Sequence, residues 1–194
     1  MTDQEKIDGL LRHINLVREN CGILAEKLIA KGEIELARGL LKNSFIHDNS
    51  KWSGIEWQFL ADPQTTNKAG LKYAIEHHQR TNPHHPEYWG NIKEMPLIYR
   101  YEMIADITAR GSEMATSARD FLNNVMPKKY GFPKDGDIHK QLVEILDMLC
   151  PRPFEPLPEP EQQTTNEQIN QTQVQQKTDA KVQGIQFSPV KDQP

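Results

Sequence analysis

The sequence has few cysteines and no long apolar run. Its 194 residues include only Cys21 and Cys150, which lie at no spacing typical of a metal site. Two cysteines are too few for a disulfide framework. No apolar stretch approaches the roughly 18 residues of a membrane span, and the acidic N-terminus is not followed by the apolar run of a presequence. These absences predict a soluble, cytoplasmic protein with no membrane partner.

Several catalytic motifs are also missing. The sequence has no glycine-rich phosphate loop, no Gly-x-Ser-x-Gly, no His-Glu-x-x-His and no Cys-x-x-Cys, so nothing indicates serine or cysteine nucleophiles. The sequence has 23 Lys and Arg residues and 27 Asp and Glu residues. Residues 155–194 contain three of the basic and six of the acidic residues, so residues 1–154 contain 20 basic and 21 acidic residues. A nearly neutral body gives no strong signal for duplex nucleic acid, although it is compatible with a small anionic ligand.

The composition changes abruptly at Cys150. Five prolines fall within residues 151–160, and ten glutamines follow between 162 and 193 with Phe187 as the single aromatic residue. Such a segment cannot bury enough apolar surface to offset the entropy of ordering it. We therefore predict one domain over residues 1–150 and a Pro/Gln-rich disordered tail over 151–194. Within the tail, residues 183–187 are a candidate for weak peptide docking to a partner, with an ordinary polar tail as the simpler interpretation.

Residues 1–150 are predicted to be all-α, with about seven helices, because apolar residues recur every three or four positions and no alternating run is present. The first predicted helix ends near Gly32. The other six cover about residues 33–47, 53–62, 67–80, 96–110, 112–125 and 138–149. The second helix is expected to bury Ile34, Ala37, Leu40, Leu41 and Phe45.

Local signals mark several of these helix ends. Ser53 and Glu56 have the spacing of a capping box at the start of the short third helix. Pro96 fits the first position of the fifth helix, and Gly111 is predicted to end it. Asp137 is predicted to cap the last helix.

Histidine is the informative excess. Six of the seven histidines lie between positions 13 and 85, and four of them fall within residues 77–85. His47 and Asp48 are adjacent at the end of the second helix, while His13 lies at the edge of an apolar stripe and Asp106 on an apolar helix. A metal site in a helical protein collects imidazoles and carboxylates from several helices. Taken singly, His13 fits an ordinary half-buried histidine and His47 a helix C-terminal residue favoured by the dipole.

The order of these residues resembles the HD-domain superfamily of metal-dependent phosphohydrolases, in which a His, an adjacent His-Asp pair, further histidines and an Asp lie on a helical bundle. The strings IHDNSKW at 46–52, NPHHPEYW at 82–89 and EMIAD at 102–106 are still more similar to a small uncharacterised bacterial and phage family related to these enzymes. The resemblance covers about residues 10–110. It implies an HD-like bundle whose principal metal is held by His13, His47, Asp48 and Asp106.

The sequence departs from binuclear relatives at one point. Only five residues separate the pairs His77-His78 and His84-His85, whereas in those relatives the isolated His and the His-His pair lie well apart. The pattern therefore leaves open which of the four bind metal and whether there is a second ion, which Asp48 would bridge. The candidate metal ligands are His13, His47, Asp48, His77, His78, His84, His85 and Asp106. The candidate catalytic residues are Asp48, Lys51 and Glu102, with Arg80 a weaker candidate for phosphate binding.

The resemblance implies hydrolysis of a nucleotide or another small phosphate ester. Imidazoles and carboxylates hold one or two divalent ions (Mn, Fe, Co, Ni, Zn or Mg), and a bound ion lowers the pKa of water from about 15.7 toward 7. Lys51 would contact a substrate phosphate. Two alternatives remain at this point: a di-iron oxygenase of the same fold, and a non-catalytic binding module that keeps the fold.

Overall fold

The computed structural model describes residues 1–62 and 64–150. The predicted tail and its candidate docking segment lie outside the described residues. Within those two ranges the chain is all-α, with seven α-helices and no strand, as predicted. The α-helices are α1 (Asp3–Ala30), α2 (Ile34–Ile46), α3 (Lys68–Thr81), α4 (Leu97–Met114), α5 (Ala118–Asp120), α6 (Met126–Tyr130) and α7 (Asp137–Leu149).

Four shorter segments complete the helical structure. Two are 3-10 helices, η1 (Asn49–Trp52) and η3 (Pro86–Tyr88), and two are π-helices, η2 (Glu56–Leu60) and η4 (Phe121–Val125). No helix among the described residues combines the length and the apolar character needed to cross a membrane.

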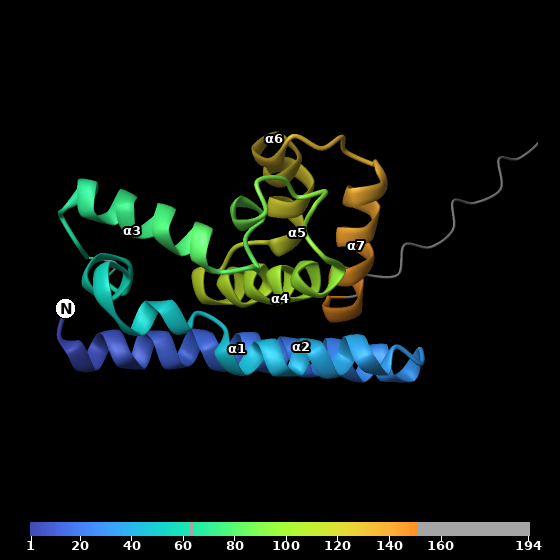
Figure 1. Ribbon diagram of the computed structural model, residues 1–194, viewed down its shortest axis with the longest axis horizontal. Helices are drawn as coiled ribbons and strands as arrows, with labels where there is room; N and C mark the ends of the chain where they lie inside the picture. The colour runs from blue at the N-terminus through green and yellow to red at the C-terminus, as the bar shows by residue number, and fades with distance from the viewer. Residues whose placement is uncertain (63, 151–194) are drawn as a thin grey trace, which may run out of the picture. The chain divides into compact units, whose positions relative to one another are not determined.

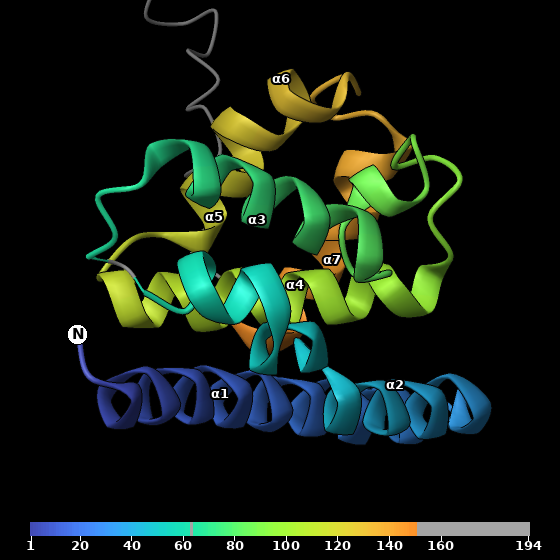
Figure 2. The same cartoon turned by 60° about the vertical axis from the view of Figure 1, so that its left-hand side comes forward.

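The long helices α1 and α2 form a hairpin that packs against α4 (Figures 1 and 2). Helix α1 begins at a capping box, in which the Thr2 hydroxyl accepts from the Glu5 amide and the Glu5 carboxylate accepts from the Thr2 amide. It is followed by Gly32, whose φ of +82° suits glycine and lets the chain reverse into α2.

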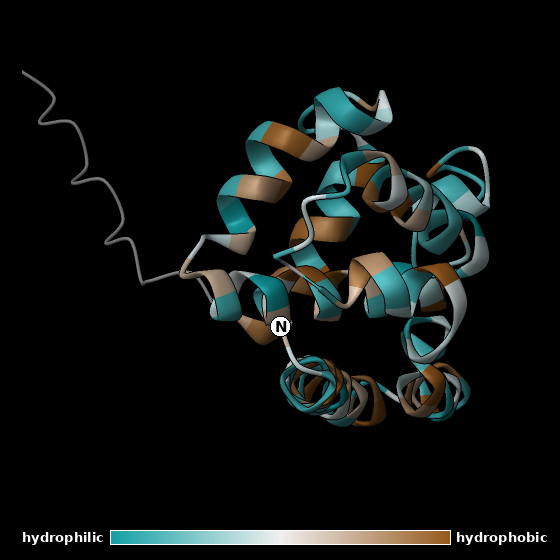
Figure 3. Ribbon diagram, turned by 90° about the vertical axis from the view of Figure 1, so that its left-hand side faces the viewer, coloured by the Kyte–Doolittle hydropathy of each residue, from teal (hydrophilic) through white to brown (hydrophobic). Residues whose placement is uncertain are grey.

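The core lies between this hairpin, α4 and α7. Bands of polar and apolar residues alternate along the helices (Figure 3), so each helix buries one side. The largest fully buried side chains of the core are Leu24, Leu28, Leu40, Ile92, Met95, Ile104, Leu122, Met126, Leu142, Ile145 and Leu146.

The predicted buried side of α2 is partly wrong. Ala37 and Leu40 are buried as expected, and Ser44 completes the buried row at spacings of three and four residues. Phe45 is 70% exposed, and Ile34 and Leu41 are also exposed. The Arg18 guanidinium covers the Phe45 ring at 5.5 Å and donates to the Phe45 carbonyl at 3.2 Å. This rotation of α2 turns His47, just beyond its end, toward the interior.

The predicted boundary at Gly111 is also wrong. Helix α4 continues to Met114 and ends at Ala115, whose φ is +51°. Gly111 is needed for a different reason: a Cβ there would lie 2.8 Å from the Thr116 carbonyl oxygen. The helix predicted over 112–125 lies later in the chain: α5, η4 and α6 follow one another without a break over residues 118–130.

Candidate metal centre

Asp48 lies at the centre of the histidine cluster. It follows α2 in a left-handed conformation (φ 57°, ψ 20°) and precedes η1. Few residues other than glycine adopt this conformation, although Asp and Asn tolerate it best, and such positions concentrate at functional sites. The turn carries the Asp48 carboxylate into the interior, where it is 1% exposed.

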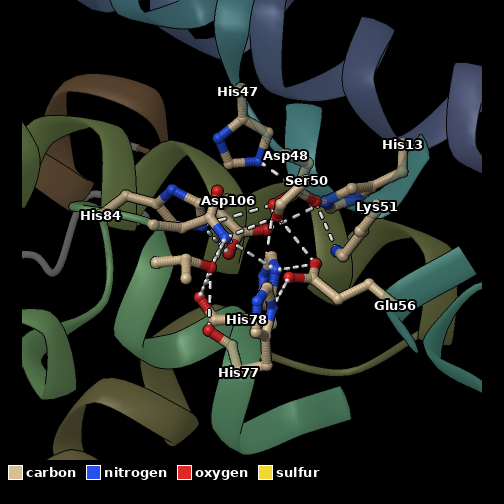
Figure 4. A network of polar contacts seen from close by, with 12 residues as sticks. His13, His47, Asp48, Ser50, Lys51, Glu56, His77, His78, His84 and Asp106 are labelled. Atoms are coloured by element: carbon tan, nitrogen blue, oxygen red, sulfur yellow. Dashed lines mark hydrogen bonds and ion pairs between the residues drawn. The ribbon is translucent and has the colours of Figure 1, made fainter. Parts of the chain in front are cut away.

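The two oxygens of Asp48 face different histidines (Figure 4). Oδ2 lies 3.4 Å from His13 Nε2 and 3.6 Å from His47 Nε2. Oδ1 lies 3.3 Å from His78 Nε2 and 3.6 Å from His84 Nε2. One carboxylate therefore stands between two sets of imidazoles.

Asp106, on α4, closes the cluster from the other side. Its Oδ1 lies 3.1 Å from His13 Nε2, and its Oδ2 lies 3.9 Å from His84 Nε2. The donor atoms fall into three overlapping groups, each within 4.8 Å, that together contain every predicted metal ligand except His77. The groups are His13 with His47 and Asp48, His47 with His84 and Asp106, and His78 with His84 and His85.

Glutamates outside the cluster hold the rings in place. Each accepts a hydrogen bond from an Nδ1–H, so that Nε2 of the same ring faces inward. Metal-binding histidines characteristically have such carboxylate partners, which fix the tautomer and the ring orientation. The contacts are Glu113 Oε2 with His13 Nδ1 at 3.1 Å, Glu102 Oε1 with His47 Nδ1 at 2.9 Å and His84 Nδ1 at 3.5 Å, and Glu56 Oε2 with His78 Nδ1 at 2.8 Å.

The inward atoms lack hydrogen bonds. Five buried side-chain atoms in the centre have no hydrogen-bond partner among the described residues: Asp48 Oδ1 and the Nε2 atoms of His13, His47, His84 and His85. Buried polar atoms are nearly always satisfied, and unsatisfied ones are costly. Imidazole nitrogens and carboxylate oxygens are ligands for divalent metals. The donor set therefore fits a metal centre, and the identity of the metal is not specified by it.

The carboxylates are strongly acidic in this setting. Burial alone would raise the pKa of Asp48, but the Lys51 ammonium and the neighbouring imidazoles outweigh it and hold that pKa well below its usual range. Burial would likewise raise the pKa of Asp106, but the imidazole of His13, 3.1 Å away, and those of His47 and His84 hold that pKa well below its usual range. Burial lowers the pKa of His13, yet the carboxylates of Asp106 and Asp48 close to its Nε2 raise that pKa overall to about 9.

The histidines near Asp48 Oδ1 behave differently. Burial lowers the pKa of His78, and burial together with the charge of His84 lowers the pKa of His85 to about 2. The pKa of His84 is raised, because hydrogen bonding to Glu102 and the nearby Asp48 outweigh its burial. Two of the three imidazoles in this group are therefore neutral near pH 7, the form that binds metal.

The structure does not bring His77 into the centre. Its side chain is 51% exposed, and its Nδ1 lies 2.6 Å from Glu56 Oε1. Glu56 is fully buried and takes hydrogen bonds from His78 and from the Ser50 hydroxyl at 2.7 Å. The predicted capping box is therefore wrong: no side chain caps this helix, because the Glu56 carboxylate is turned toward the histidines instead.

Sequence reasoning missed two of the supporting glutamates, Glu56 and Glu113. A signal for Glu113 was present, since Glu102, Asp106 and Glu113 are spaced by four and seven residues and so share one side of α4. Glu56 had no comparable signal, because its partners lie on α3.

The predicted catalytic residues all lie at or beside the centre. Lys51 is buried and its Nζ contacts Asp48 Oδ2. Glu102 binds His47 and His84 and accepts a hydrogen bond from Asn43 Nδ2 at 3.2 Å, which is the geometry of a positioning residue. Arg80 is exposed and does not line the pocket described next.

A pocket of about 890 Å³ opens beside the cluster. Lys51, His78, His85 and Asp106 form part of its lining, so the centre is reached from the pocket. The remaining lining comes mainly from α4, α5 and η4. Pockets of this size accommodate small molecules.

His139, in the last helix, is buried but does not belong to this cluster. Its Nε2 lies 3.1 Å from Asn123 Oδ1, and its ring packs near Phe132. It belongs to the α7 packing and to none of the candidate metal groups found among the described residues.

A family profile matches residues 2–151, and its description is "family of unknown function (DUF5662)". The match spans more than half of the chain, so the protein belongs to this family. No curated protein and no solved structure gave a significant match.

Proposed function

We propose that the protein is a metal-dependent phosphohydrolase with a two-ion centre bridged by Asp48. One observation carries the proposal: the two oxygens of a single buried carboxylate face two sets of histidines. Ions about 3.5–4 Å apart that share a carboxylate are typical of enzymes that displace a group at phosphorus. The resemblance of the sequence to the HD-domain superfamily supports the same reaction class.

The ligands divide between the two positions. His13, His47, Asp48 and Asp106 would hold the first ion, and Asp48, His78, His84 and His85 would hold the second. Bound ions would supply a water of lowered pKa and neutralise charge on the phosphate oxygens. In the hydrolysis, a bond forms between the water oxygen and phosphorus while the ester P–O bond breaks, which gives an alcohol and inorganic phosphate.

The chain's own groups have separate tasks in this reaction. The Lys51 ammonium stands beside Asp48 and at the pocket, where it would attract a substrate phosphate as a point charge. Glu102, Glu56 and Glu113 orient the ring nitrogens and keep each tautomer fixed. The burial of Asp48 places its carboxylate in a medium of lower dielectric constant than water, which strengthens its interactions with charged groups.

A second reaction is favoured by the imidazoles of His78, His84 and His85, because three such ligands also suit iron. An iron-loaded protein of this kind would consume oxygen while cleaving its substrate, whereas hydrolysis consumes none. Activity that requires oxygen would replace the proposal with an oxygenase, and equal activity in anaerobic and aerobic assays would support it.

The direct test is metal analysis of purified protein combined with a phosphate-ester screen. We expect two divalent ions per chain, a melting temperature raised by one of Mn, Fe, Co, Ni, Zn or Mg, and release of phosphate from nucleotides or simpler esters. A protein that binds none of these ions and gains no thermal stability from them would instead be a non-catalytic binding module.

A further inference from the structure

We propose that the pocket beside the metal centre binds the apolar part of an anionic ester, so that the preferred substrate is the phosphate monoester of an apolar alcohol rather than a nucleotide. The assignment of the phosphate group to the metal centre rests on the proposed function. The choice of alcohol rests on the pocket alone.

One part of the pocket is suited to an anion. Lys51 and the candidate ligands His78, His85 and Asp106 meet there, and Arg110 adds a second cation. Arg110 is 47% exposed, and its Nη1 lies 3.0 Å from Glu113 Oε2, which in turn supports His13. The phosphate group therefore belongs at this end, next to the centre.

The walls of the pocket are suited to an apolar group. Ile75, Met114 and Val125 line it and are 39%, 70% and 43% exposed. Leu60 and Phe121 line it as well. Large apolar side chains gathered around a pocket, beside a buried charged cluster, characterise ligand sites whose occupant contributes apolar surface.

Two π-helices contribute to these walls. Helix η4 supplies Phe121 and Val125, and η2 supplies Leu60 at its end while its first residue is Glu56. π-Helical turns are rare and occur frequently at functional sites. The segment η2 thus joins the support of His78 directly to the apolar wall.

The pocket is less suited to a nucleotide. Base recognition relies on stacking and on hydrogen bonds to the base edges. Besides the histidines, the aromatic rings in the lining are Phe121 and Tyr130, and Lys129 Nζ already lies over the Tyr130 ring, 4.7 Å from its centroid. Asp120, also in the lining, would repel the charges of a di- or triphosphate.

The test measures binding of alkylphosphonates, which are not hydrolysed, to the manganese-loaded full chain by titration calorimetry. From methyl- to hexylphosphonate we expect the affinity to rise by up to about fourfold per methylene group, from the burial of apolar surface. Met114→Asp should flatten this dependence. Ile34→Asp, which changes an exposed residue of α2 outside the pocket in the same way, should keep it.

An affinity that does not change with alkyl length, or AMP binding more tightly than hexylphosphonate, would overturn the inference. The same series run with phosphate esters separates it from the proposed function. If affinity rises with chain length while no ester is hydrolysed, the hydrolase proposal fails and the pocket assignment stands. If methyl and hexyl phosphate are hydrolysed with equal kcat/KM, the hydrolase proposal stands and the pocket assignment fails.

Discussion

The two oxygens of Asp48 face ligand sets that differ in composition and in their place in the fold. On the Oδ2 side, His13 and His47 come from the α1–α2 hairpin, together with the carboxylate of Asp106 from α4. On the Oδ1 side, the imidazoles come from α3 and the turn that follows it.

This difference affects how each side competes with protons. Next to two carboxylates, the pKa of His13 is raised to about 9, so that a proton occupies the metal-free site near neutral pH. On the Oδ1 side, burial and the charge of His84 lower the pKa of His85 to about 2, whereas Glu102 and Asp48 raise the pKa of His84 itself. The carboxylate-rich side therefore exchanges a proton for a metal ion, whereas His85 is ready to bind one.

Removing the carboxylate that both sides share should have the largest effect. We expect Asp48→Ala to lose both ions and phosphatase activity. It should also destabilise the fold by about 3–5 kcal/mol, because Lys51 is left buried without its partner. Metal analysis and chemical denaturation measure the two effects, with Asp8→Ala, at an exposed position of α1, as control. An Asp48→Ala protein that kept its metal and activity would refute the assignment.

Removing one side should leave the other intact. His85→Ala is expected to lower the metal content from two ions to one, because His85 belongs only to the group of donors that it forms with His78 and His84. His139→Ala, which removes a buried histidine outside the centre, should leave the content at two. Elemental analysis after removal of loosely bound metal measures the number of ions per chain in each variant. Loss of both ions in His85→Ala would mean that the sites are not separable.

Weakening the supporting glutamates should produce a smaller effect on each side. We expect Glu56→Gln to lower the affinity of the Oδ1 side, and Glu113→Gln that of the Oδ2 side, each by about 10- to 100-fold. Competition with a chelator of known affinity measures this. Glu94→Gln, at an exposed position, serves as the control. If either substitution lowered the metal affinity of both sides equally, the division of the ligands between two ion positions would be contradicted.

A further effect is expected from pH in the metal-free protein. Because the pKa of folded His13 is about 9 and its ordinary value is 6.5, charged His13 stabilises the fold fully below about pH 6.5. That contribution is lost as the pH rises through about 9. The melting temperature of chelator-treated protein should therefore fall over this interval, and His13→Gln should flatten the fall. A wild-type curve that rises with pH would exclude a charged His13.

The residues of the centre were predictable from the sequence to different degrees. His47 and Asp48 were found because they are adjacent, and Asp106 because a carboxylate on an apolar helix needs a partner. His78 and His77 are neighbours on one helix, where a rotation of about 100° decides which points inward. Only the packing of α3 determined that His78 faces Asp48 while His77 is half exposed.

Other errors share that cause. The spacing of Ser53 and Glu56 fitted a helix cap, and the apolar Phe45 and Ile34 fitted a buried side of α2. Glu56 is drawn instead to His77 and His78, far away in the sequence. Such contacts are invisible to a pattern that spans a few residues.

By itself, the sequence determined that residues 1–150 form helices and that imidazoles and carboxylates are available on several of them, because helical periodicity and side-chain chemistry are local properties. Tertiary structure decided which nitrogen of each ring faces Asp48, which glutamate holds the other nitrogen, and which apolar residues line the pocket. These depend on the packing of helices distant in the chain, where a rotation of about 100° about the helix axis moves a side chain from the centre to the surface.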